Sequence, residues 1–116
     1  NMSVEQIETN MIPLAEKIRS RHLHTTILFV DNLMYERACL DEATRNTVIA
    51  RNEAMKRVFD RMKGQGFSNI FLIEKNGAIG TDHEATVDGV HLTDLGFLRY
   101  ADFLIEKIRG LNLVLN

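Results

Sequence analysis

The sequence predicts an α/β fold built on a parallel sheet, and two observations lead to this prediction. Two short apolar runs, residues 25–30 and 67–73, are rich in β-branched and aromatic side chains and do not alternate with polar ones. Such runs are typical of parallel strands that are buried on both faces. Segments with apolar residues at helical spacing precede, separate and follow these runs. The resulting order of helix, strand, helix, strand, helix is that of a parallel sheet covered by helices.

The first helix is expected over residues 3–22. Ser3 and Gln6 have the spacing of a capping box, in which each side chain binds a free backbone N–H at the start of the helix. Pro13 lies inside the helical pattern and should remove one backbone hydrogen bond, so we expect a kink there. One apolar face is formed by Ile7, Met11, Leu14, Ala15 and Ile18.

The first strand is expected to end at Asp31, and residues 33–40 show no periodicity and are predicted to form a loop. Asp41 is the expected N-cap of a long second helix that reaches about Lys63 and is ended by Gly64 and Gly66. The apolar residues of this helix hold the helical spacing at Val48, Met55, Phe59 and Met62.

A long segment, residues 74–92, follows the second strand and contains three glycines together with several Asp and His residues. An irregular segment of this length is more often functional than idle. The last helix is expected to begin near Thr93, with one apolar face formed by Phe97, Ala101, Leu104, Ile105 and Ile108. Because a sheet of two strands would leave both edges open, we expect the chain to be part of a larger domain.

Composition argues against several classes of function. The formal net charge of −2 leaves no basic excess for binding nucleic acid or an anionic membrane surface. No apolar run approaches the roughly 20 residues of a membrane-spanning helix, and we find no signal peptide. The single cysteine, Cys39, forms no internal disulfide and cannot supply a zinc cluster by itself. The cell compartment stays open.

The most informative pair of residues is Asp88 and His91. At this spacing the two side chains can lie side by side on one turn, so that the carboxylate accepts the Nδ1 hydrogen of the ring and Nε2 is free to act as a base. The pair follows the carboxyl end of a predicted strand, where ligands bind in open α/β sheets. A plainer interpretation is equally compatible with the spacing: Asp88 caps a turn and His91 is half-buried. A metal site is a third interpretation, with Asp82 and His83 as further ligands.

A longer motif surrounds this pair. Gly80-Thr81-Asp82, residues 85–97 (Ala-Thr-Val-Asp-Gly-Val-His-Leu-Thr-Asp-Leu-Gly-Phe) and Arg99-Tyr100-Ala101-Asp102 resemble the last block of SGNH (GDSL-like) hydrolases. The motif is most similar to that of the bacterial GDSL-like lipase/acylhydrolase branch, which reads Thr-Val-Asp-Gly-x-His-Pro-x-Asp-Leu-Gly-Phe. This sequence departs from it at Leu92, where the branch usually has Pro. The resemblance covers essentially the whole chain.

The resemblance implies a three-layer, flavodoxin-like α/β fold of which residues 1–116 form the C-terminal part of a single SGNH hydrolase domain. It assigns Asp88 and His91 to the catalytic acid and base, and Asn1, in the opening Asn-Met-Ser, to the oxyanion hole. The blocks that carry the nucleophilic serine and a glycine oxyanion donor have no match. Ser3, Ser20 and Ser68 fall at a helix cap, a helix end and the start of a strand, so the serine is expected upstream of Asn1.

The resemblance therefore implies a serine esterase that cleaves acyl or acetyl esters of a small molecule, carbohydrate or lipid, without cofactor or metal. The isolated chain is expected to be inactive because it lacks the serine. Two alternatives stay open: a non-catalytic α/β binding or assembly module, and a metal-dependent hydrolase that uses Asp82, His83, Asp88 and His91. The bacterial branch is compatible with a periplasmic or secreted protein, and nothing in the sequence selects between compartments.

Overall fold

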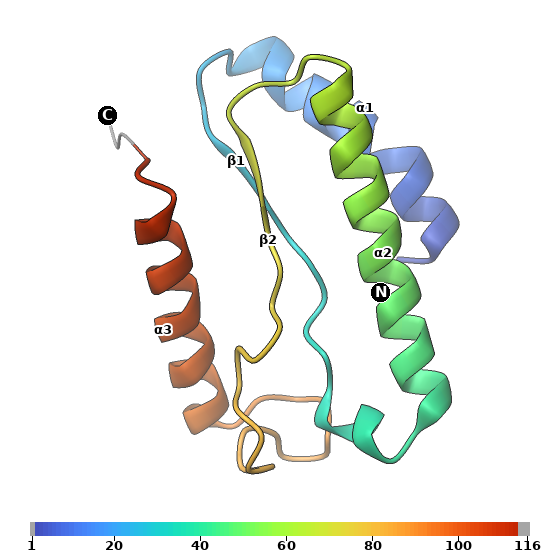
Figure 1. Ribbon diagram of the computed structural model, residues 1–116, viewed down its shortest axis with the longest axis vertical. Helices are drawn as coiled ribbons and strands as arrows, with labels where there is room; N and C mark the ends of the chain where they lie inside the picture. Colours follow the sequence, from blue (N-terminus) through green and yellow to red (C-terminus); the bar gives the residue numbers. More distant parts are fainter. Residues whose placement is uncertain (1, 114–116) are drawn as a thin grey trace. The chain divides into compact units, whose positions relative to one another are not determined.

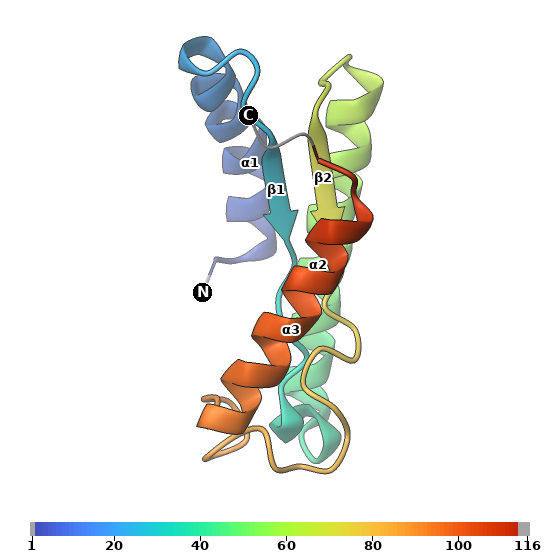
Figure 2. The ribbon, with the colours of Figure 1, turned by 90° about the vertical axis from the view of Figure 1, so that its left-hand side faces the viewer.

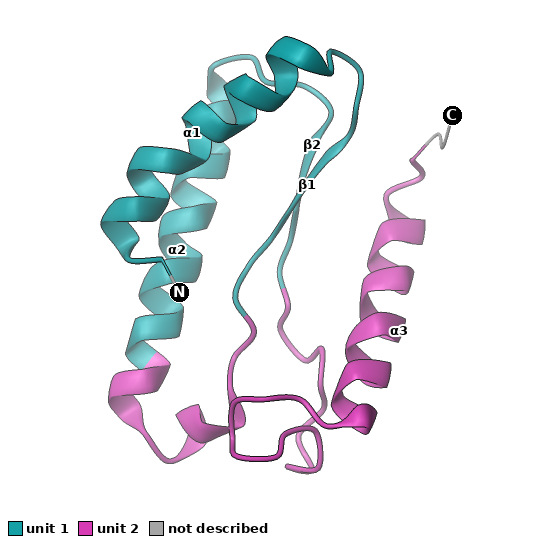
Figure 3. Cartoon of the chain, turned by 180° about the vertical axis from the view of Figure 1, so that it is seen from behind, with its two compact units in different colours: residues 1–32, 46–74 teal, residues 33–45, 75–116 magenta. Residues whose placement is uncertain are grey.

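The computed structural model describes residues 2–113 and confirms the predicted order of helices and strands (Figure 1). The described elements are α1 (Val4–Arg21), β1 (Ile27–Val30), the 3-10 turn η1 (Glu36–Cys39), α2 (Glu42–Gly64), β2 (Ile70–Ile73) and α3 (Asp94–Gly110). The turn η1 lies in the segment for which the sequence predicts a loop. The chain forms two compact units (Figure 3). Unit 1 contains the residues up to Asn32 and Asn46–Glu74, and unit 2 contains Leu33–Arg45 and the residues from Lys75 onward.

Unit 1 is built on the parallel pair of strands β1 and β2, which run side by side in the same direction (Figure 2). Ile27 pairs with Ile70 at one end of the sheet and Val30 pairs with Ile73 at the other. Since register partners point to the same face of a sheet, Ile27 and Ile70 enter one core together. That core also contains buried side chains of both helices: Ile7, Met11, Ala15, Ala54, Val58 and Met62.

The first helix of unit 1, α1, begins as the sequence predicts. The Gln6 N–H donates to the Ser3 hydroxyl over 3.1 Å and the Ser3 N–H donates to the Gln6 side-chain oxygen over 2.9 Å, which completes the capping box. Pro13 lies inside α1, and the helix continues past it to Arg21. Leu14 is predicted on the buried face but is 57% exposed. It borders an open apolar hollow of about 380 Å³ together with Leu28 and other side chains.

Unit 2 is organised around α3, whose N-cap is Thr93: its hydroxyl accepts the Gly96 N–H over 3.0 Å. The predicted apolar face is only partly buried: Leu104 and Ile108 are half-buried, whereas Phe97 is 60% exposed and Ile105 is 46% exposed. The helix instead turns a neighbouring face inward, on which Gly96 is buried and two aromatic side chains pack. This core of unit 2 contains Leu33, Ala78, Ile79, Ala85, Leu92, Tyr100 and Phe103.

Within residues 2–113, no helix is both long enough and apolar enough to cross a membrane.

Candidate active site

The loop between β2 and α3 folds back on itself before the last helix begins. Thr86 and Leu92 form an isolated antiparallel bridge. Inside it, the Val87 N–H donates a hydrogen bond of 2.8 Å to the His91 carbonyl oxygen. Gly89 lies within this turn at φ +87°, a left-handed conformation that favours glycine. The turn sets the spacing between the two side chains that the sequence pattern singles out.

The side chains of Asp88 and His91 are hydrogen-bonded, as their spacing predicts. The distance from His91 Nδ1 to Asp88 Oδ2 is 2.7 Å. The other carboxylate oxygen, Oδ1, accepts two backbone hydrogen bonds, from the N–H of His91 at 2.8 Å and from the N–H of Val90 at 3.0 Å. The backbone N–H of His91, followed by its ring and the N–H of Val90, holds the pKa of Asp88 well below its usual range. The carboxylate is therefore ionised and fixed by three donors.

This arrangement orients the imidazole ring. Because the Asp88 carboxylate is an acceptor only, the hydrogen of the neutral ring lies on Nδ1 and the lone pair lies on Nε2. Among the described residues, Nε2 has no hydrogen-bond partner, and the His91 side chain is 79% exposed. The pair can thus accept a proton at Nε2 from a group that approaches it, and the carboxylate then faces the resulting imidazolium.

The four residues of the predicted metal alternative do not come together. Asp82 forms a two-pronged ion pair with the Arg99 guanidinium, with distances of 2.7 Å and 2.6 Å. These hydrogen bonds hold the pKa of Asp82 well below its usual range. Asp88 is bound to His91, and His83 lines a pocket instead. In residues 2–113, no group of three or more His, Cys, Asp or Glu side chains is placed to hold a metal ion.

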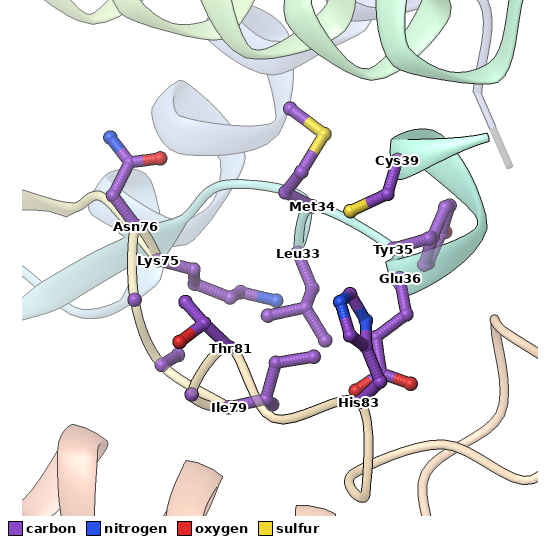
Figure 4. Close-up of a pocket in the computed structure, with 13 residues that line it drawn as sticks. Leu33, Met34, Tyr35, Glu36, Cys39, Lys75, Asn76, Ile79, Thr81 and His83 are labelled. Carbon is purple, nitrogen blue, oxygen red and sulfur yellow. The ribbon is translucent and has the colours of Figure 1, made fainter. Parts of the chain in front are cut away.

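A pocket of about 360 Å³ lies within unit 2, between the segment around η1 and the start of the long loop (Figure 4). Its apolar wall includes Leu33, Met34 and Ile79. Figure 4 shows the Lys75 side chain extending across the pocket, and its ammonium group lies 4.9 Å from the centre of the Tyr100 ring. The polar groups on the wall include Glu36, Cys39, Thr81 and His83. A mainly apolar pocket with a few polar groups is the usual form of a small-molecule site.

The remaining predicted residues are placed as follows. Asn1, the proposed oxyanion donor, lies outside the described residues. The Ser3 hydroxyl caps α1, and the Ser20 hydroxyl donates to the Lys17 carbonyl oxygen over 2.8 Å at the end of the same helix. Ser68 precedes β2. These positions agree with the predicted cap, helix end and strand start.

Of two further residues near the pair, Glu36 is not singled out by the sequence, and Thr86 appears there only as part of the longer motif. The Glu36 carboxylate accepts a hydrogen bond from the Thr86 hydroxyl, fifty positions away, and one from the Ala85 N–H at 3.3 Å. Glu36 lies in a segment without periodicity, and Thr86 precedes the Asp-x-x-His pattern. No local signal connects residues so far apart in the chain, so only the folded structure reveals this contact.

The fold and the site together define an α/β protein with an acid–base pair in a loop that follows a parallel strand, an arrangement found in serine-type hydrolases. The chain belongs to the GDSL-like Lipase/Acylhydrolase family, whose sequence model matches residues 1–109. The resemblance seen in the sequence is therefore confirmed.

Two solved structures share the fold. A GDSL-like lipase from Bacteroides ovatus ATCC 8483 is 29% identical, with a TM-score of 0.91 over 95% of this chain and 33% of its own. The salicylyl-acyltransferase SsfX3 from a tetracycline biosynthetic pathway is 16% identical, with a TM-score of 0.77 over 96% of this chain and 34% of its own. This chain thus spans about one third of the length of the structures it matches. No curated protein sequence matches it.

Proposed function

We propose that this chain supplies the catalytic acid and base of a serine esterase that hydrolyses acyl esters. The observation that carries the proposal is the 2.7 Å contact between His91 Nδ1 and Asp88 Oδ2, within a chain that belongs to the GDSL-like family. Residues 1–116 would form the C-terminal part of a single SGNH hydrolase domain, and the nucleophilic serine would precede Asn1.

The geometry supports the following reaction. The serine hydroxyl attacks the carbonyl carbon of the ester, and His91 Nε2 takes the hydroxyl proton as the new C–O bond forms. The ester C–O bond then breaks, and His91 returns the proton to the leaving alcohol. Water enters the acyl-enzyme by the same route, with His91 as the base, and releases the acid and the free serine. Asp88 stays ionised throughout and stabilises the imidazolium.

Asn1 would contribute a side-chain N–H to the oxyanion hole, a role in which one donor is worth roughly 3 kcal/mol of transition-state stabilisation. The pocket beside η1 would receive part of the ester, because its apolar wall suits an acyl chain or the apolar part of an alcohol. The substrate class is an acyl or acetyl ester of a small molecule, carbohydrate or lipid. No step requires a cofactor or a metal.

Acyl transfer to an alcohol is the second candidate, because a neighbour in fold is a salicylyl-acyltransferase. The two reactions share the acyl-enzyme and differ in whether water or an alcohol attacks it. Product analysis with and without an added alcohol separates them: an esterase releases the free acid in both cases, and a transferase forms a new ester.

The test uses p-nitrophenyl acetate and the complete protein from which this chain comes. His91→Ala and Asp88→Asn should each lower kcat, the latter by about 10⁴-fold, because the ring then loses the tautomer that it needs. Asp102→Asn, at an exposed carboxylate on α3, is the matched control and should leave the rate unchanged. The 116-residue chain alone should not turn over the ester. Full activity in the Asp88→Asn variant would favour the non-catalytic module and refute the proposal.

A further inference from the structure

We propose that Glu36 is a positioning residue that holds the loop carrying Asp88 and His91 in its reactive shape. The proposal rests on the proposed function, because Asp88 and His91 need this geometry only if they are the catalytic acid and base. The positioning itself is argued from contacts within unit 2. Glu36 acts on the pair indirectly, through the stretch of backbone just before Asp88.

The first part of the mechanism is the pair of hydrogen bonds that the Glu36 carboxylate accepts from the loop. One oxygen accepts the N–H of Ala85 at 3.3 Å, and the other accepts the hydroxyl hydrogen of Thr86. Ala85 is fully buried, and Glu36 and Thr86 are half-buried. A hydrogen bond to an ionised carboxylate is stronger than one between neutral groups, and partial burial shields it from water. The loop is therefore anchored two residues before Asp88.

The second part is what this anchor does to Thr86. A hydroxyl has one hydrogen and two lone pairs. Because the hydrogen of Thr86 is committed to Glu36, a lone pair remains for the N–H of Gly89, which donates to Thr86 Oγ1 over 3.1 Å. The Thr86 side chain thus connects the two ends of the turn that contains Val87 and Asp88. By accepting the hydroxyl hydrogen, Glu36 orients the hydroxyl so that its lone pair faces the Gly89 N–H.

The third part closes the ring of contacts. The carbonyl oxygen of Gly89 accepts the N–H of Arg37 at 2.9 Å, and Arg37 is the next residue after Glu36. A Cβ atom on Gly89 would lie 3.0 Å from the Arg37 Cβ atom and 3.3 Å from its backbone nitrogen, so this close approach also depends on glycine. Glu36 and Arg37 therefore hold both ends of the segment 86–89, and Asp88 lies inside it.

The segment that carries Glu36 and Arg37 is itself held in place by hydrogen bonds. Ala38 of η1 is buried, and its N–H donates to the Tyr35 carbonyl oxygen at 3.0 Å. The Asp41 N–H donates to the Arg37 carbonyl oxygen at 2.9 Å, which ties η1 to the start of α2. A displacement of about 1 Å in a catalytic group can lower the rate by about 10²-fold. The reaction therefore depends on a rigid attachment of the loop that carries Asp88.

The test measures kinetics and structure in the complete protein. Glu36→Ala removes both acceptors, and Thr86→Val removes the hydroxyl at nearly constant shape. Each should lower kcat by roughly 10²-fold while KM changes little, because the pair is displaced and the substrate contacts are not. Thr86→Ser keeps the hydroxyl and should restore most of the rate. Glu42→Gln, at an exposed carboxylate at the start of α2, is the matched control and should behave as the wild type.

The structural readout is the proton NMR signal of the His91 Nδ1 hydrogen, which lies far downfield when this hydrogen is bound to a carboxylate and needs no substrate. It should be broadened or lost in Glu36→Ala and Thr86→Val and retained in Thr86→Ser and Glu42→Gln. Thr86→Val also keeps the test decisive if Glu36→Ala does not fold.

The outcomes separate this proposal from the proposed function. A retained signal with unchanged kcat in Glu36→Ala and Thr86→Val would overturn the positioning role and leave the esterase intact. A retained signal with raised KM would also overturn it, because Glu36 would then act on the substrate in the pocket that it lines. If the wild type had no esterase activity but the two variants lost the signal, the esterase would be refuted and the positioning of His91 by Glu36 supported.

Discussion

Replacing Gly96 by Ala should destabilise unit 2, although an alanine in a helix usually stabilises it. Gly96 lies in the first turn of α3, and its backbone approaches the loop closely. A Cβ atom at this position would lie 2.1 Å from the Ala85 carbonyl oxygen and 3.2 Å from the Leu92 Cβ atom. The same Ala85 oxygen accepts the Thr93 N–H over 2.9 Å. The methyl group would therefore enter the space in which the loop is bound to the start of the helix.

Whether Gly96→Ala stabilises or destabilises the fold depends on the size of two opposing free-energy contributions. Alanine gains about 1 kcal/mol over glycine in a helix interior, and less in the first turn. Overpacking costs about 1–3 kcal/mol, and the backbone carbonyl at Ala85 cannot rotate away as a side chain would. Separating the helix from the loop also stretches the hydrogen bond from Thr93, which is worth about 0.5–1.5 kcal/mol. We expect Gly96→Ala to lower the free energy of unfolding by about 1–3 kcal/mol.

The assay is urea unfolding of the complete protein, followed by far-ultraviolet circular dichroism. Gly110→Ala is the matched control, because it lies at the other end of α3 and a methyl group there would meet no described atom within 4 Å apart from its chain neighbours and the nearby backbone of its own helix. It should leave the stability unchanged or raise it by up to about 1 kcal/mol. A Gly96→Ala variant as stable as the Gly110→Ala variant would refute the packing of α3 against the loop at Ala85.

Three further predictions concern the same loop. Thr93→Ala should lower the free energy of unfolding by about 1 kcal/mol, because the Gly96 N–H loses its cap, and Thr93→Ser should not; urea unfolding measures both. The pKa values of Asp82 and Asp88 are lowered in the folded state, so both carboxylates contribute stability above their ordinary pKa of about 3.9 that is lost as the pH falls further. Acid titration of the fold should therefore show a loss below about pH 4, and Asp82→Asn should make it shallower. Treatment with EDTA should leave esterase activity unchanged, and a loss restored by a divalent cation would favour the metal-dependent alternative.

Periodicity predicts the order of the elements and most of the buried face of α1, but not the face that α3 buries. The core of α1 agrees at Ile7, Met11 and Ala15, which are all buried. In α3 the predicted face is exposed at Phe97 and Ile105, and the neighbouring face with Gly96 and Tyr100 packs inward. The reason is that α3 has apolar residues on more than one side, so the choice depends on the shape of the surface opposite. A glycine carries no hydrophobic signal, although here it marks the closest approach.

The site also has one contact that the sequence predicts and one that it does not. The contact between Asp88 and His91 spans three positions on one turn, so the spacing allows it, and the longer motif favours it over a plain turn cap. The contact between Glu36 and Thr86 spans fifty positions and depends on how two irregular segments meet. Irregular segments show no periodicity, so the sequence does not predict which of their residues come into contact. The roles of Asp88, His91 and Asn1 stay predictions.

The exposure of the pair explains why its geometry needs support from the surrounding backbone. The Asp88 and His91 side chains are 54% and 79% exposed, and even an ion pair between side chains this exposed contributes little stability by itself. The orientation of the Asp88 carboxylate depends instead on the backbone N–H groups of Val90 and His91, which donate whatever the charge of the ring. The contacts of Glu36 and Thr86 hold the segment 86–89, which ends directly before these two donors. The carboxylate is therefore preorganised before His91 becomes charged. Under the proposed function, catalysis requires this preorganisation, because water around an exposed pair weakens its electrostatic stabilisation of the imidazolium.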